Sequence, residues 1–177
     1  MALAGRRDPD GLLTVAAKKP HGGTLAVVAL ERAGVAHTVH PYVHDAASDV
    51  GYGLEAAAAL GVPPAHVFKT LLADVDGRLV VAVVPVDRQL DLKALARAVG
   101  GKRAGMAQPA AAERATGYVV GGISPLGQKQ RHATVVDASA EAFDVVYVSG
   151  GRRGLDVGLA PADLVRLTGA TVADVAR

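Results

Sequence analysis

The chain has 177 residues, a formal net charge of +2 and no cysteine. This length fits one domain with a hydrophobic core, and the absence of cysteine excludes a disulfide scaffold, a thiolate nucleophile and any Cys-ligated metal site. No apolar run approaches the roughly 20 residues that a membrane-spanning helix needs. We therefore expect a cytoplasmic protein with no membrane partner, in which residues 1–23 form a flexible tail and residues 24–177 form one domain.

Apolar periodicity and turn residues predict alternating helices and strands along that domain. The expected helices, each of which ends in glycine, are residues 24–34, 53–61, 90–100, 109–117 and 160–169. The expected strands are residues 35–42, 66–74, 78–86, 118–120, 133–137, a short stretch near 103–107 and two strands within 144–159. Asp76-Gly77 predicts a hairpin turn. This order predicts an α/β fold with a mixed, mostly antiparallel curved sheet or partial barrel and flanking helices.

One lysine interrupts the apolar strand "VFKTLL" at residues 67–72. Alternation along a strand places Lys69 on the same face as Val67 and Leu71. An unpaired ammonium buried on such a face would cost several kcal/mol, so Lys69 must extend to solvent, pair with an anion or line a polar pocket. The stretch alone favours a lysine that reaches solvent or protects a sheet edge.

The stretch "GGISPLGQK", residues 121–129, is a glycine-rich connection between two expected strands. Gly122 and Gly127 have the spacing of a nucleotide-binding P-loop, but Gln128 stands where that motif requires lysine. Leu126 stands where a nucleophile elbow needs its second glycine. Both motifs are therefore excluded. Two alternatives stay open, a loop that exposes backbone groups to a close ligand and a tight connection that needs positive φ.

Positive charge gathers in the second half of the chain. Residues 24–99 carry six basic and eight acidic side chains, whereas residues 102–153 carry seven basic and four acidic ones. A second glycine loop, "VSGGRRG" at residues 148–154, contributes two arginines. The excess lies around Lys129, Arg131, Arg152 and Arg153. These residues form either a solvated face or a surface that binds phosphate.

The histidines and aromatic residues argue against two other classes of site. His40 and His44 are four residues apart, but Pro41 disfavours a helix there and no further ligand accompanies them. We therefore expect no metal and no cofactor. Aromatic residues make up only 3% of the chain, too few for a platform that stacks single-stranded nucleic acid, and we expect no DNA partner.

Three stretches that occur in this order, "VFKTLL", "GYVVGGISPLGQK" and "VYVSGGRRGLD", resemble the YbaK family of aminoacyl-tRNA deacylases. The resemblance runs from about Thr24 to Arg177 and is to the branch that hydrolyses Cys-tRNA(Pro), which is related to the editing domain of bacterial prolyl-tRNA synthetases. It implies a single α/β domain with a mixed sheet wrapped into a partial barrel. It also implies a pocket for the 3′ aminoacyl end of a mischarged tRNA, and prolyl-tRNA synthetase as a candidate partner.

The resemblance also implies roles for particular residues. The implied catalytic positions are Lys69, Gly121 and Gly122. The implied substrate-binding positions are Tyr42, Phe68, Ile123, Ser124, Ser149 and Asp156, and the implied tRNA-binding positions are Lys129, Arg131, Arg152 and Arg153. The match at Tyr42 is partial, because this sequence has "PYVHDA" where many relatives have Glu and Pro nearby. Lys69 would contact the phosphate of the terminal adenosine, and the backbone of Gly121 and Gly122 would lie against the aminoacyl group.

The resemblance implies a mechanism that uses the thiol of the substrate. The cysteinyl sulfur attacks the ester carbonyl, a thiolactone forms and the tRNA is released. A chain without cysteine, without a nucleophile elbow and without a metal-ligand cluster fits that mechanism. Three alternatives remain at this point: deacylation of another mischarged tRNA such as Ala-tRNA(Pro), a non-catalytic module that binds a tRNA end or another anion, and a protein-interaction domain.

Overall fold

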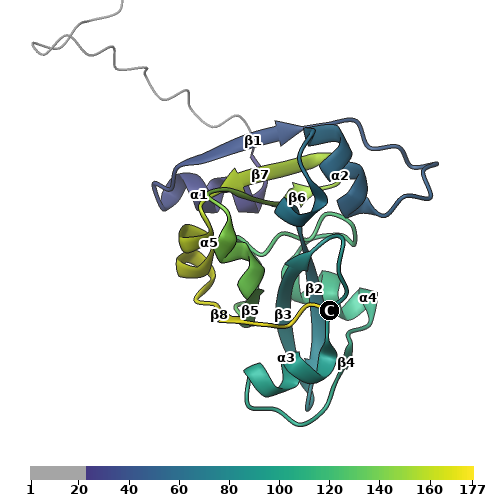
Figure 1. Cartoon of the computed structure of the whole chain (residues 1–177), viewed down its shortest axis with the longest axis vertical. Helices are drawn as coiled ribbons and strands as arrows, with labels where there is room; N and C mark the ends of the chain where they lie inside the picture. Colours follow the sequence, from purple (N-terminus) through teal and green to yellow (C-terminus); the bar gives the residue numbers. More distant parts are fainter. Residues whose placement is uncertain (1–22) are drawn as a thin grey trace, which may run out of the picture.

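The computed structural model of the chain describes residues 23–177, which form helices packed around two β-sheets (Figure 1). The α-helices are α1 (Leu25–Arg32), α2 (Tyr52–Leu60), α3 (Leu92–Ala98), α4 (Pro109–Thr116) and α5 (Pro161–Thr168). The strands are β1 (His37–Pro41), β2 (Phe68–Val75), β3 (Arg78–Pro85), β4 (Ala104–Met106), β5 (Ala133–Asp137), β6 (Val146–Arg152), β7 (Leu155–Leu159) and β8 (Thr171–Ala173). Two 3₁₀ helices, η1 (Pro64–His66) and η2 (Ala138–Ala142), complete the elements. The predicted tail at residues 1–23 falls outside the described residues, apart from Gly23.

Capping and turn residues begin and end the elements where the sequence predicts. The Thr24 hydroxyl and the Asp91 carboxylate accept hydrogen bonds from N–H groups in the first turns of α1 and α3. Asp76 and Gly77 have φ values of 50° and 85°, which is the backbone of a two-residue hairpin turn between β2 and β3. These local predictions are confirmed.

The strands divide between two sheets. The smaller sheet has the order β1-β7-β6 and is antiparallel, and the larger has the order β4-β2-β3-β5-β8, in which β5 runs parallel to both of its neighbours. Figure 1 shows the smaller sheet above the larger one. The predicted α/β class and the mixed, mostly antiparallel pairing are confirmed. The sheet does not close into a barrel, and a single bridge between Val67 and Tyr147 connects the start of β2 to β6.

The main hydrophobic core is shared by both sheets. It combines buried residues of β2, β3, β6 and β7 with residues of α1, α4 and α5, among them Phe68, Val81, Val148, Val157, Leu30 and Leu164. A second core on the other face of the larger sheet packs Ala73, Val80, Val84 and Leu95. The start of β2 therefore lies where the two sheets and their shared core meet, and this position defines the functional site below.

Several elements differ from the sequence prediction. Residues 118–120, predicted as a strand, form part of a turn, because their polar groups are satisfied locally. The hydroxyl of Tyr118 donates to the carbonyl of Leu126 at 2.6 Å, and the N–H of Val120 donates to the Glu113 carboxylate at 2.9 Å. Strand β8 and the 3₁₀ helices η1 and η2 were not predicted. Between residues 23 and 177, no helix has the length and apolar character needed to span a membrane.

Candidate active site

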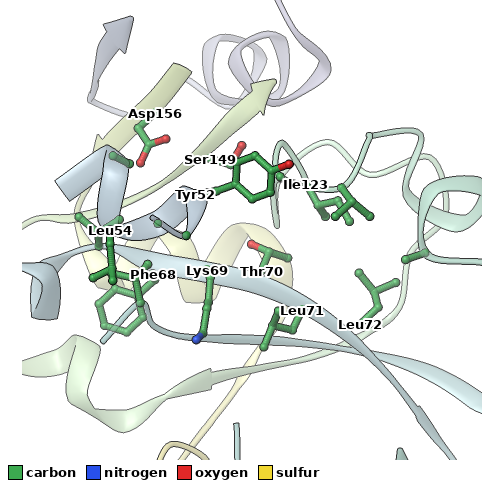
Figure 2. Close-up of a pocket in the computed structure, with 18 of the residues that line it drawn as sticks. Tyr52, Leu54, Phe68, Lys69, Thr70, Leu71, Leu72, Ile123, Ser149 and Asp156 are labelled. Atoms are coloured by element: carbon green, nitrogen blue, oxygen red, sulfur yellow. The ribbon is translucent and has the colours of Figure 1, made fainter. Parts of the chain in front are cut away.

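A pocket of about 390 Å³ opens beside the first half of β2. Its walls come from β2, the start of α2, the glycine loop after α4, and the facing strands β6 and β7. Among the sequence-predicted site residues, the pocket lining brings together Tyr42, Phe68, Lys69, Gly121, Ile123, Ser149 and Asp156 (Figure 2). Residues from widely separated parts of the chain, from Tyr42 to Asp156, are therefore neighbours in one concave site, which is a common setting for ligand binding.

The pocket lies along an open edge of β2. Strand β4 pairs with β2 only from Ala73 to Val75, and the carbonyl of Leu72 accepts one further bond from the N–H of Ala107 at 3.0 Å. Backbone polar groups of successive residues face opposite edges of a strand, so the N–H and C=O of Thr70 face the same edge as the Leu72 carbonyl. Within the described residues, no strand pairs with that edge between the Leu72 carbonyl and the bridge that joins Val67 to Tyr147. A ligand can therefore reach backbone groups and both faces of β2.

Lys69 is a half-buried cation of the pocket. It makes no ion pair within residues 23–177. Burial lowers the pKa of its ammonium group, and the negative charge of Asp87 partly opposes that effect. Figure 2 shows Lys69 and Thr70 leaving β2 in opposite directions. The ammonium of Lys69 is thus available for an anionic ligand.

Asp156 is the second notable ionisable residue of the pocket. It is 5% exposed, and it lies opposite Ser149 on β6 and opposite His40 on β1. Its carboxyl group has no ion-pair or hydrogen-bond partner among residues 23–177. Desolvation by burial raises the pKa of this carboxyl from 3.8 to about 7.

Three hydroxyl groups lie around the same pocket. The pKa of Tyr42 is raised to about 12 by burial first, and then by the negative charges of Asp156 and Glu55. The hydroxyl of Ser149 accepts a hydrogen bond from the N–H of Gly151 at 3.2 Å. The hydroxyl of Thr70 is buried and has no hydrogen-bond partner. Buried polar atoms are normally satisfied, so the Thr70 hydroxyl is a candidate contact for a ligand.

The glycine loop packs against the second glycine loop. A Cβ atom on Gly122 would lie 2.8 Å from the Cα of Arg152, and one on Gly121 would lie 2.8 Å from the ring of Tyr52. Arg153 donates two hydrogen bonds to the carbonyl of Val120, at 3.0 and 2.7 Å, and its guanidinium lies over the Tyr52 ring at 5.1 Å. These contacts within the protein leave no room for a Cβ atom at either position, so they account for both glycines without a ligand. Gly121 lines the pocket, whereas Gly122 is buried behind it.

Ser124 lies outside the pocket lining, unlike the other expected substrate contacts. It is fully buried, and its hydroxyl accepts a hydrogen bond from the N–H of Leu126 at 3.2 Å. Its carbonyl accepts a bond from the side chain of Gln128 at 2.9 Å. Ser124 thus stabilises the loop from within, and its expected contact with substrate stays a prediction.

The four basic residues expected to bind tRNA are exposed, and none of them lines this pocket. Arg153 is held by Val120 and Tyr52 beside the pocket, as described above. Arg131 lines two other hollows of the surface. Lys129 and Arg152 extend from the two glycine loops.

The histidine pair is explained by local contacts. Nδ1 of His44 lies 2.8 Å from the Glu55 carboxylate, and Nε2 of His40 lies 2.7 Å from the Thr38 hydroxyl. No group of three or more metal-ligating side chains occurs in the part of the chain that the structure describes.

Sequence reasoning missed Tyr52 and Thr70 as members of the site. Tyr52 begins α2 and, at 41% exposed, covers Gly121. The available signal in the sequence was a tyrosine one residue before the predicted helix. Thr70 follows Lys69 in the strand, and only the three-dimensional structure shows that its hydroxyl is unsatisfied.

Comparisons with known proteins agree with this geometry. The family model for the aminoacyl-tRNA editing domain matches residues 51–167. EbsC of Enterococcus faecalis, named as a Cys-tRNA(Pro)/Cys-tRNA(Cys) deacylase, is 38% identical over 121 residues, which are 67% of this chain and 73% of that relative. ProXp-y of Escherichia coli, named as a multifunctional Ser/Thr-tRNA deacylase, is 36% identical over 89 residues, half of this chain and 53% of its own length.

A solved structure described as a trans-editing enzyme for prolyl tRNA synthetase superposes with a TM-score of 0.76 at 27% identity, and the match covers 86% of this chain and 95% of that one. The resemblance that the three sequence stretches carry is thereby confirmed. This chain belongs to the aminoacyl-tRNA editing domain family.

Proposed function

We propose that this protein is a trans-editing enzyme that deacylates mischarged Cys-tRNA(Pro), and that residues 24–177 act as one deacylase domain. The observation that carries the proposal is the pocket beside β2, which combines an unpaired cation, an unpaired carboxyl and an open strand edge in a member of the editing family. The 38% identity to EbsC supports cysteine as the amino acid removed. The protein would act in the cytoplasm, where tRNA is aminoacylated.

Lys69 would bind the phosphate of the terminal adenosine. Burial lowers the pKa of its ammonium, and a phosphate beside it would favour the charged form and offset its desolvation. This contact would hold the aminoacyl ester along the open edge of β2. The backbone N–H and C=O of Thr70 would then face the ester.

The chemical step would use the thiol of the substrate. Its sulfur attacks the ester carbonyl carbon, the C–S bond forms, the bond from the carbonyl carbon to the ribose oxygen breaks, and that oxygen takes the proton. The products are a cysteine thiolactone and free tRNA. Two observations support this step: the chain has no cysteine, and no histidine is among the described residues that line the pocket near Ser149. Positioning of the thiol against the carbonyl would therefore supply most of the rate enhancement.

Recognition of the tRNA body would involve the exposed basic residues Lys129, Arg131 and Arg152, and prolyl-tRNA synthetase would be the partner that supplies the mischarged tRNA. The matched structure, described as a trans-editing enzyme for prolyl tRNA synthetase, supports that partner. Binding through such exposed cations should weaken steeply as salt is raised.

A panel of tRNA(Pro) esters tests the proposed substrate. Wild-type protein should release cysteine from Cys-tRNA(Pro) much faster than alanine from Ala-tRNA(Pro) or serine from Ser-tRNA(Pro), and mass spectrometry should detect the thiolactone or its thiol-trapped product. Equal release of serine and cysteine would contradict the thiol-assisted step. If the protein hydrolyses none of these esters but still binds tRNA in a salt-dependent way, the proposed function would be wrong and the protein would be a binding module.

A further inference from the structure

The buried carboxyl group of Asp156 has no role in the thiol attack on the ester that is proposed above. Asp156 is 5% exposed and has no partner among the described residues, although an ionised carboxylate in such a position is unfavourable. An asparagine or a valine there would remove this cost. The carboxyl group of Asp156 therefore suggests a ligand that carries the missing charge.

The groups that face Asp156 do not supply that charge. On β6 its neighbour is the neutral Ser149, and Tyr42, which directly follows β1, has a phenol that stays protonated at neutral pH. On β1 its neighbour is His40, whose Nε2 is engaged by Thr38. The pocket's lysine makes no ion pair with it. The pocket thus presents a cation and a carboxyl that do not neutralise each other.

The substrate carries the complementary pair of charges. An aminoacylated terminal adenosine has a phosphate on one side of the ester and an α-ammonium group on the other. The ammonium is a donor of three hydrogen bonds and accepts none. Figure 2 shows the oxygens of Asp156, Ser149 and Thr70 on the Tyr52 side of β2, away from the Lys69 ammonium. The Thr70 hydroxyl is a further unsatisfied oxygen of that side.

We propose that Asp156 binds the α-ammonium group of the aminoacyl ester, so that the pocket accepts aminoacyl-tRNA with a free α-amino group and rejects tRNA whose amino acid is N-acylated. This inference rests on the proposed deacylase function. An ammonium beside the carboxylate makes a charge-assisted hydrogen bond and offsets the desolvation of Asp156. N-acylation removes the charge, removes donors and adds bulk in the same place. Formylated or peptidyl esters would therefore be excluded by the same residue.

The ionisation of Asp156 supports this assignment. In the free protein, burial raises the pKa of its carboxyl to about 7, so a bound cation would stabilise the ionised form and lower that pKa. A carboxyl with such a pKa could also act as a general base toward water. That role would not depend on the α-amino group, so the two roles predict different substrate ranges.

The test compares Cys-tRNA(Pro) with N-acetylcysteinyl-tRNA(Pro) that has a free thiol, each rate being divided by the spontaneous hydrolysis rate of the same ester. Wild-type protein should prefer the free amine by about 10- to 100-fold in kcat/KM, the range expected for one charge-assisted hydrogen bond. Asp156→Asn should lose most of this preference through a raised KM for Cys-tRNA(Pro), with little change for the acetylated ester. Asp156→Glu should restore part of it.

The wild-type preference is measurable even if a variant does not fold. Equal normalised rates for both esters in the wild type would overturn the role of Asp156 and leave the deacylase function in place. Preference retained in folded Asp156→Asn would overturn it as well. Failure of the wild type to hydrolyse Cys-tRNA(Pro) would overturn the deacylase function and this inference with it.

Discussion

Asp156→Asn should make the protein more stable at neutral and alkaline pH, although it changes a residue of the proposed substrate pocket. Burial raises the pKa of this carboxyl from 3.8 to about 7, because no cation or donor among the described residues compensates its ionised form. At about 1.36 kcal/mol per pH unit, this difference corresponds to about 4 kcal/mol in the free energy of unfolding. Water that enters the pocket reduces the cost, so we expect a measured gain of about 2–4 kcal/mol.

The direction follows from proton binding to the two states. Between about pH 4 and pH 7, the native carboxyl keeps a proton that the unfolded chain has released, so the free energy of unfolding of the wild type falls as the pH rises. Below about pH 4 both states are protonated, and the wild type has its full stability relative to Asp156→Asn. Above about pH 7 both states are ionised, and the advantage of the variant is complete and constant.

Urea unfolding from pH 4 to pH 8.5 measures this difference. Because the chain has no tryptophan, far-UV circular dichroism is the suitable probe. Subtracting the two curves cancels the contribution of Glu55, Asp76 and Asp91, whose pKa values are lowered and which act at more acidic pH. A difference that does not vary with pH, or a wild type that is more stable than the variant at pH 8, would refute the reasoning that Asp156 is buried without a partner.

Two further variants test how the site is supported. Gly122→Ala should lower the free energy of unfolding by about 1–3 kcal/mol, because its Cβ would lie 2.8 Å from the backbone of Arg152. Gly105→Ala, which has no atom within 4 Å of its added Cβ, is the matched control, and equal melting temperatures of the two variants would contradict this reading. Arg153→Ala should raise the KM for Cys-tRNA(Pro) several-fold by releasing the Val120 carbonyl, and Arg153→Lys should not restore it, since lysine lacks the planar fork that makes both bonds. Arg152→Ala is the control for lost surface charge, and an equal effect in both alanine variants would assign Arg153 to tRNA binding instead.

Local signals in the sequence predicted most of the fold because the residues that cap helices and form turns act on their own neighbours. Asp76-Gly77 forms its hairpin, and Thr24 begins its helix, through contacts within a few residues. Residues 118–120 show the limit of this reasoning. Their apolar pattern predicts a strand, but the Tyr118 hydroxyl and the Val120 N–H find partners within the loop and the preceding helix.

The site was predictable only in part. Lys69 carries a signal in the sequence, because a lysine in an apolar strand requires an explanation. The isolation of Asp156 carries none, because it depends on which residues of two other strands lie beside it. The glycine pair was predicted to need close approach, but the neighbours are Tyr52 and Arg152 of the same chain, which lie far from it in sequence. Contacts of this kind are set by the packing of the two sheets and the loops.

The measurement that tests the central claim most directly is the release of labelled cysteine from Cys-tRNA(Pro) by the wild type and by Lys69→Ala. Lys93→Ala, an exposed lysine on α3, serves as the control for a lost positive charge. Loss of a charge-assisted phosphate contact of about 3 kcal/mol predicts that kcat/KM of Lys69→Ala falls about 100-fold or more, with an unchanged fold and with Lys93→Ala at wild-type rate. Wild-type turnover by folded Lys69→Ala would contradict the account of the site.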